Sequence, residues 1–218
     1  MTSLPIYWPL AADFGELARG SLPVPWQRTA LEQRFELVPL DTLSPIEPLA
    51  PGAPVIDPLE QLEHLAVIQP RGLSPADNVA LDAWVRKGGE LLLLLDPALT
   101  GHYELPLGDP RMPSLAALIP PVVARWGLEI RFDEAQADQP SPLELEKGSL
   151  PLFLSGTIAS RPEAQSDCTI SPGGALARCR IGKGRVTLLA DAAVFEHRRL
   201  AGENGEAIAA LLRLGFAS

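Results

Sequence analysis

LAVIQPRGLSPADNVALDAWVRKGGELLLLLDP, residues 65–97, predicts a strand, a helix and a second strand in succession. The runs at 65–69 and 90–95 are short and apolar, as expected of strands. Between them, Ser74 is a favoured helix N-cap, Pro75 suits the first helical position, and Gly88 suits a left-handed turn at the helix end. Residues at helical spacing connect these ends: Val79, Ala80, Ala83, Trp84 and Lys87. Because two strands joined through a helix imply parallel pairing with a right-handed crossover, we expect an α/β fold.

Length and charge limit the possible partners. The chain has 218 residues, which suffices for one large domain or two small ones. A net charge of −9 without a basic run disfavours nucleic acid and anionic membrane surfaces as main partners. The longest apolar run, at 91–95, is far shorter than the roughly 18 residues of a membrane span. The first residues do not form a signal peptide, although an anchor removed upstream and either a periplasmic or a cytoplasmic location remain compatible with the sequence.

The rest of the chain predicts further elements around the central unit. Strands are expected at 4–8, 35–40, 128–132 and 152–154, helices at 26–33, 114–126 and 203–214, a polar segment at 13–19 and a proline-rich loop at 42–59. Pro120 and Pro121 should kink or split the second helix. The runs 175–181 and 185–190 flank Gly182-Lys183-Gly184 and predict an antiparallel hairpin. We therefore expect one α/β domain over residues 1–218, with a mixed sheet.

Two cysteines, Cys168 and Cys179, lie outside any CxxC pattern and away from metal-spaced histidines. We expect them to be buried thiols. The alternative is a disulfide between neighbouring strands, which an oxidising compartment would favour.

The polar residues that follow the central strands are the candidate site. Open α/β sheets bind ligands beyond the carboxyl ends of their strands, where this chain carries Gln69, Arg71, Asp96 and Asp191. We assign these four residues to small-ligand or partner contacts. Asp96 and Asp191 have the chemistry to ligate a metal or orient a hydroxyl, but an Asp after a strand often caps the next turn instead.

Catalytic motifs are missing from the sequence. No Ser or Cys occupies a G-x-S/C-x-G turn, the three histidines do not cluster, and neither GxGxxG nor GxxxxGK[ST] occurs. We therefore predict no catalytic residue, no metal and no cofactor.

Three segments of the chain resemble one family in its own order: 74–97, with SPAD followed by ALDAWVRKGGELLLLLDP, 115–132 (LAALIPPVVARWGLEIRF) and 182–195 (GKGRVTLLADAAVF). The family is that of GldG-type proteins, auxiliary components of ABC transport systems, which are also similar to class I glutamine amidotransferase-like domains. The glutaminase cysteine has no counterpart, since Asp96-Pro97 stands in the corresponding turn. The resemblance implies a three-layer, mostly parallel flavodoxin-like or amidotransferase-like sheet with a C-terminal antiparallel hairpin. It also implies permease and ATPase subunits as partners.

We accordingly expect a non-catalytic accessory or binding domain of an ABC-type transport system, acting through protein–protein or small-ligand contacts. Two alternatives stay open. One is a hydrolase of the amidotransferase-like fold that uses the carboxylates of Asp96 and Asp191 with a metal. The other is a sugar-binding domain of the trehalose-utilisation type.

Overall fold

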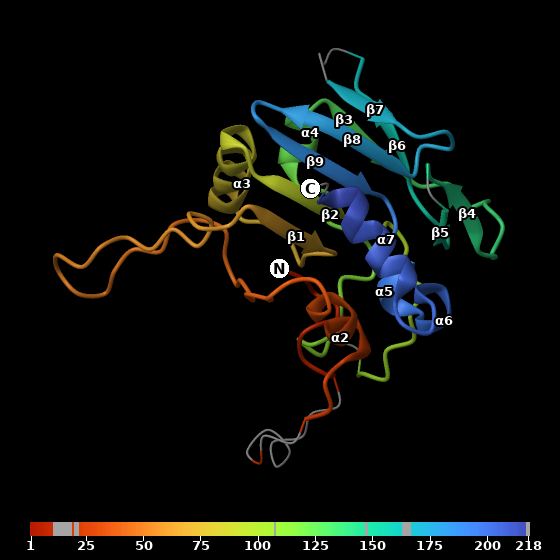
Figure 1. Cartoon of the computed structure of the whole chain (residues 1–218), viewed down its shortest axis with the longest axis horizontal. Coiled ribbons are helices and arrows are strands. Elements are labelled where there is room, and N and C mark those ends of the chain that lie inside the picture. The colour runs from red at the N-terminus through yellow and green to blue at the C-terminus, as the bar shows by residue number, and fades with distance from the viewer. Residues whose placement is uncertain (11–18, 20–21, 107, 147, 163–166, 217–218) are drawn as a thin grey trace.

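A five-stranded sheet forms the centre of the computed structural model, which describes residues 1–10, 19, 22–106, 108–146, 148–162 and 167–216 (Figure 1). The strand order is β1-β2-β9-β8-β7. The first three strands are mutually parallel, whereas β8 and β7 run antiparallel to their neighbours. The mixed sheet expected from the sequence is confirmed, whereas the mostly parallel sheet that the family resemblance implied is not, because two of these four strand pairings are antiparallel. The strand bounds are β1 His64–Ile68, β2 Glu90–Leu94, β9 Gly184–Leu189, β8 Leu176–Ile181 and β7 Cys168–Ile170.

The strand–helix–strand unit is confirmed. Helix α3 (Pro75–Lys87) begins with a capping box, in which the Ser74 hydroxyl accepts from the Asp77 N–H at 3.0 Å and Asp77 accepts from the Ser74 N–H at 3.1 Å. Gly88 ends the helix with a φ of 131°. The buried face of α3 differs from the spacing that marked the helix in the sequence. Trp84 is buried, but Val79 is 71% exposed.

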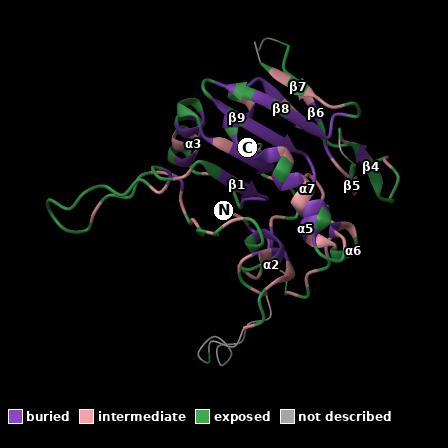
Figure 2. Ribbon diagram, in the orientation of Figure 1, coloured by how far each residue is buried: buried purple, intermediate pink, exposed green. Residues whose placement is uncertain are grey.

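Helices lie on both faces of the sheet, and two buried apolar clusters fill the spaces between the layers. On one face, α3 packs beside α4 (Pro121–Arg125), and on the other α7 (Glu206–Gly215) crosses β2 and β9. Helix α7 confirms the helix expected at 203–214, and its buried residues include Ala207, Ile208, Leu211 and Leu212. Figure 2 shows the central strands as the most thoroughly buried part of the protein. Shorter helices are α2 (Trp26–Glu32), α5 (Ala193–Glu196) and α6 (Arg198–Ala201).

The N-terminal strands expected at 4–8 and 35–40 are not formed. Thr2 makes a single parallel bridge to Ile68, and the chain then leaves the edge of β1. Pro5 and Pro39 explain part of the difference, because proline has no N–H to donate to a sheet ladder. Both segments instead line a hollow of about 430 Å³ beside β1. The polar segment expected at 13–19 lies, apart from Arg19, outside the described residues.

Two small antiparallel sheets accompany the central one. β3 (Leu128–Arg131) pairs with β6 (Thr157–Ser160), and β4 (Ser141–Glu144) pairs with β5 (Ser149–Leu152). The strand expected at 128–132 is thus confirmed, whereas the one expected at 152–154 ends where it was predicted to begin. The helix expected at 114–126 starts only at Pro121, because proline suits the first helical position and disfavours helix before it.

The C-terminal hairpin of β8 and β9 is confirmed, with Gly182 at a φ of 62°. Gly184 is needed for packing, because a Cβ there would lie 2.0 Å from the Val85 carbonyl oxygen of α3. The expectation of buried thiols was wrong. Cys168 and Cys179 face each other across β7 and β8, with their Cα atoms 4.0 Å apart, and form a disulfide.

The proline-rich segment before β1 leaves the body as a long arm (Figure 1), within which Ile46 and Ile56 form one antiparallel bridge. Within the described residues, no helix combines the length and the apolarity that crossing a membrane requires.

Candidate functional site

Three of the four residues proposed for the strand ends lie together. Gln69 follows β1 in a left-handed conformation, with a φ of 45°. Its Nε2 donates to the carbonyl oxygens of Asp96 (2.9 Å) and Ser114 (2.7 Å), and its Oε1 accepts from the Asp96 N–H at 2.8 Å. The side chain therefore joins the turns that follow β1 and β2. Gln69, Asp96 and Asp191, which we call the strand-end cluster, each have no exposed surface.

The two aspartates cap and connect turns. Asp96 accepts from the N–H of Ala98 and from that of Ala192, each at 2.8 Å. Asp191 accepts from the N–H of Ala193 at 2.8 Å and of Phe153 at 2.7 Å. Every carboxylate oxygen of the pair thus has a backbone donor, and none faces solvent. The capping alternative accounts for both residues.

Arg71 differs from the buried strand-end cluster in being exposed. Its side chain is exposed and donates to the Met112 carbonyl oxygen at 2.8 Å. Among the described residues, its side chain makes no hydrogen bond to Gln69, Asp96 or Asp191.

Burial changes the acidity of the cluster. It raises the pKa of Asp96 to about 7, which the charge of Glu196 supports and the hydrogen bonds from Ala98 and Ala192 oppose. Burial also raises the pKa of Asp191 well above its ordinary value, and the neighbouring charge of Asp96 adds to the effect. Like charges held together away from water favour a state in which a proton is retained.

A further carboxylate, that of Glu196 on α5, was missed by sequence reasoning. It accepts from the N–H groups of Thr100 (3.0 Å) and Gly101 (2.8 Å) and from the Tyr103 hydroxyl (2.5 Å). Burial and this hydrogen bond raise the pKa of Tyr103. Through these hydrogen bonds, Glu196 connects the loop after β2 to α5. No local pattern in the sequence connects positions that lie more than 90 residues apart.

The Thr100 hydroxyl lies 2.7 Å from Nε2 of His197, a pairing of hydroxyl and imidazole that nucleophilic enzymes use. The surroundings oppose that chemistry. The Thr100 and Gly101 amides, which might stabilise an oxyanion, already donate to the Glu196 carboxylate. A negative group at this position would repel the charge that develops in acyl transfer.

Metal binding finds no support at the strand ends. Among the residues that the structure describes, no three His, Cys, Asp or Glu side chains lie close enough together to hold an ion. In the conformation of this structure, the oxygens of Asp96 and Asp191 are already occupied by backbone donors.

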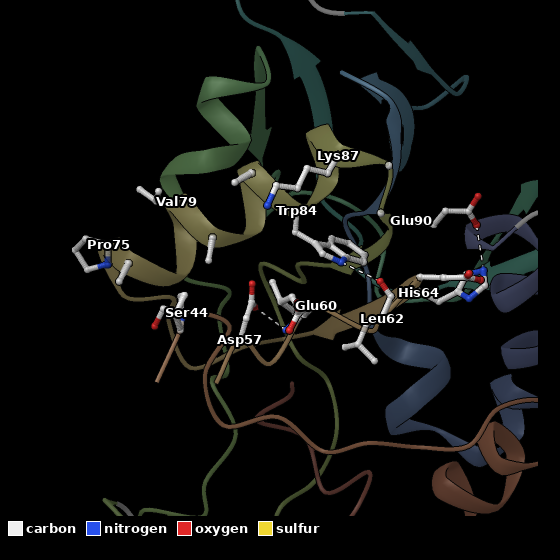
Figure 3. A pocket seen from close by; sticks show the side chains of 18 residues that line it. Ser44, Asp57, Glu60, Leu62, His64, Pro75, Val79, Trp84, Lys87 and Glu90 are labelled. Carbon is white, nitrogen blue, oxygen red and sulfur yellow. Dashed lines mark hydrogen bonds and ion pairs between the residues drawn. The ribbon is translucent and has the colours of Figure 1, made fainter. Parts of the chain in front are cut away.

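An open groove lies at the opposite, amino-terminal ends of β1 and β2 (Figure 3). It has a volume of about 1110 Å³ and runs between α3 and the segment 57–64. Its apolar lining comes from both sides and includes Leu59, Leu62, Val79, Ala83 and Trp84. We call this surface the α3 groove.

Hydrogen bonds to α3 fix both walls of the groove. Trp84 reaches across the floor, and its Nε1 donates to the Leu62 carbonyl oxygen at 3.0 Å (Figure 3). At the other end, Asp77 Oδ1 accepts from the N–H groups of Leu43 (2.8 Å) and Ser44 (3.0 Å). Burial alone would raise the pKa of Asp77, but its several hydrogen bonds outweigh burial and hold that pKa well below its ordinary value. The groove is therefore a built feature of the fold.

The rim of the α3 groove is mostly acidic. Asp57, Glu60 and Glu63 are exposed along one side, and Lys87 is exposed on α3. At the inner end, Glu90 pairs with Arg185 and lies 3.4 Å from Nε2 of His64. The Arg185 guanidinium therefore offsets the Glu90 charge, while the buried Oε2 of Glu90 accepts no hydrogen bond from the described residues.

Sequence reasoning did not find this groove. Val79 looked like one of several apolar residues at helical spacing, a pattern typical of a buried face. Nothing in the sequence of α3 indicated that part of its apolar surface stays uncovered. The exposure of Val79 depends on tertiary packing, because the neighbouring segments leave this residue 71% exposed.

These features define a mixed α/β protein with internally satisfied carboxylates at its strand ends and an open groove at the other end of the sheet. The chain belongs to the family described as ABC-type uncharacterized transport system, whose model matches residues 25–153, more than half of the chain. This membership confirms the resemblance of its sequence segments to auxiliary components of ABC transport systems.

Other comparisons contribute little. None of the curated proteins matches the chain. Among solved structures, an exo-beta-1,4-mannosidase from Opitutaceae bacterium strain TAV5 is 19% identical, with a TM-score of 0.46, over 70% of this chain and 25% of that one. A cytoplasmic protein from Salmonella typhimurium LT2 is 11% identical, with a TM-score of 0.42, over 70% of this chain and 71% of that one. The chain spans about a quarter of the mannosidase, and at such scores neither resemblance bears on activity.

Proposed function

We propose that residues 1–218 act as one non-catalytic, amidotransferase-like α/β domain that docks onto the permease or ATPase subunits of an ABC-type transport system through the α3 groove. Family membership supports the association with transport. One apolar cluster supports a single domain, because it includes residues from Leu4 to Phe216. The flavodoxin-like layering and a ligand role for Gln69, Arg71, Asp96 and Asp191 stay predictions.

The observation that carries the proposal is the exposure of Val79 beside a large open groove. Val79, which is 71% exposed, adjoins Leu62, Ala83 and Trp84 in the lining of the groove, and a contiguous apolar patch of this kind is typical of an interaction surface. The hollow is an open groove of about 1110 Å³ between α3 and the segment 57–64, a shape that can accept a polypeptide segment. The strand-end cluster offers no comparable access.

Copurification with the transporter tests this proposal. We expect the tagged wild-type chain to retain permease or ATPase subunits from detergent-solubilised native membranes, and Val79→Asp to lose them. Leu118→Asp is the matched control, because Leu118 is 60% exposed and lies outside the groove. Equal retention by the wild type and Val79→Asp, with both variants folded by circular dichroism, would refute docking through the groove.

Hydrolysis is the second candidate, and the 2.7 Å contact between Thr100 and His197 is the observation in its favour. A panel of ester, amide and glycoside substrates tests it, with and without added divalent metal. We expect no turnover above buffer. Turnover that disappears in Thr100→Ala or Asp96→Ala, with the fold retained, would establish an enzyme instead.

A further inference from the structure

We propose that the segment bound by the α3 groove is a cationic amphipathic helix of a transporter subunit, with apolar residues on one side flanked by Lys or Arg. This inference rests on the proposed docking function and names the chemistry of its partner. It follows from two properties of the groove, unpaired acidic groups at its rim and an apolar floor, and from a third property, the net charge of the whole chain.

The first property is the unbalanced charge of the rim. Among the described residues, the carboxylates of Glu60 and Glu63 have neither a hydrogen bond nor an ion pair. Asp57 accepts one backbone N–H, from Leu59 at 2.9 Å, and keeps its charge exposed. Among the exposed lining side chains that are described, Lys87 is the only Lys or Arg, and His64 lies beside Glu90. The rim therefore attracts a cationic segment and repels an anionic one.

The second property is the apolar surface between the charged groups. Leu59 and Trp84 are nearly buried, so they form a firm floor, whereas Val79 and Ala83 stand exposed on α3. A helix that places its apolar stripe in such a groove covers the exposed Val79 and Ala83, and the residues that flank the stripe then reach the rim. In this arrangement Lys or Arg side chains keep their charged ends in water while their stems cover apolar surface.

The third property is the net charge of −9, which extends the attraction beyond the groove. A field of one sign accelerates the encounter with a segment of the opposite sign and falls steeply with ionic strength. The same field disfavours an anionic membrane surface or a nucleic acid as the occupant.

Two synthetic amphipathic helices with the same leucine pattern, one with lysines and one with glutamates on the polar face, provide the test. Binding of each fluorescently labelled peptide to the full chain is followed by anisotropy at low and at 0.5 M salt. We expect the lysine peptide alone to bind, and its affinity to fall at least about tenfold at high salt. Binding of the glutamate peptide with equal affinity would overturn the inference.

Variants then locate the effect. Glu60→Lys combined with Glu63→Lys should weaken lysine-peptide binding by at least about tenfold. The control, Glu134→Lys with Glu203→Lys, changes the net charge equally at exposed positions outside the groove and should leave most of the affinity. Equal losses of affinity in both double variants would show that net charge alone causes the loss, and would refute a binding site for a cationic helix in the groove.

The outcomes separate this inference from the docking proposal. If Val79→Asp abolishes copurification of the transporter while the rim variant retains it, docking stands and the cationic partner is refuted. If Val79→Asp retains the transporter, docking itself fails, whatever the peptides do.

Discussion

Asp96 carries a pH signature that follows from its burial. Its pKa is raised to about 7 in the folded protein from an ordinary value of 3.8. Between these values the folded state holds a proton that the unfolded state releases, so the free energy of unfolding falls as pH rises. The stabilisation is complete below about pH 4 and is lost as pH passes through about 7. Asp191, whose pKa is also raised, adds to the same trend.

We therefore expect urea unfolding to show decreasing stability from pH 4.5 to pH 7.5, and Asp96→Asn to flatten that slope. Asp133→Asn, at an exposed turn, should leave the slope unchanged. Stability that rises across this range in the wild type would contradict a buried, protonated Asp96.

Asp77 illustrates the opposite case, a carboxylate held charged by its donors. It connects the start of α3 to Leu43 and Ser44 and so maintains one wall of the groove. Asp77→Ala leaves the buried Leu43 N–H without a partner, which should lower the free energy of unfolding by about 2–3 kcal/mol. Chemical denaturation measures this loss. A change below about 0.5 kcal/mol, the size usual for surface substitutions, would show that Asp77 does not hold the wall.

At the scale of residues, the sequence placed polar groups correctly and offered capping as a role for the two aspartates. Asp96 and Asp191 follow central strands as predicted, because an Asp after a strand is locally recognisable. Their mutual proximity, and the addition of Glu196, depend on how the turns pack. The sequence also does not show which apolar residues of a helix are exposed, and for this reason Val79 looked like a core residue.

At the scale of elements, prediction succeeded where both ends of an element carried signals. Helix α3 had Ser74 and Pro75 at its start and Gly88 at its end, and all three act as expected. The strand expected at 4–8 had an apolar pattern but also a proline within it, and only Thr2 pairs with β1. A strand requires a partner with free backbone groups, which local sequence does not specify.

The disulfide belongs to the same scale, because it ties the edge strand β7 to β8. Cys168→Ser with Cys179→Ser should lower the free energy of unfolding by roughly 2–3 kcal/mol, mainly by freeing the unfolded chain. Denaturation of the oxidised wild type and the double variant measures the difference. Two titratable thiols in the native, oxidised protein would show instead that the bridge does not form.

At the scale of the whole molecule, the two ends of the sheet differ in structure. At the carboxyl ends of β1, β2 and β9, Gln69 bonds to the backbone of Asp96, and the Asp96 and Asp191 carboxylates accept from backbone N–H groups of neighbouring turns. The amino ends of β1 and β2 open into the α3 groove. A fold that commonly places ligands at the first end would here present its partner surface at the other.

Site-specific photo-cross-linking in cells that contain the native transport system tests most directly whether the partner contacts the α3 groove. A photoreactive amino acid replaces Val79 in the groove in one experiment and the exposed Arg71 near the strand ends in another. Docking through the α3 groove predicts an adduct with a permease or ATPase subunit from position 79 and none from position 71. An adduct from position 71 together with none from position 79 would contradict it.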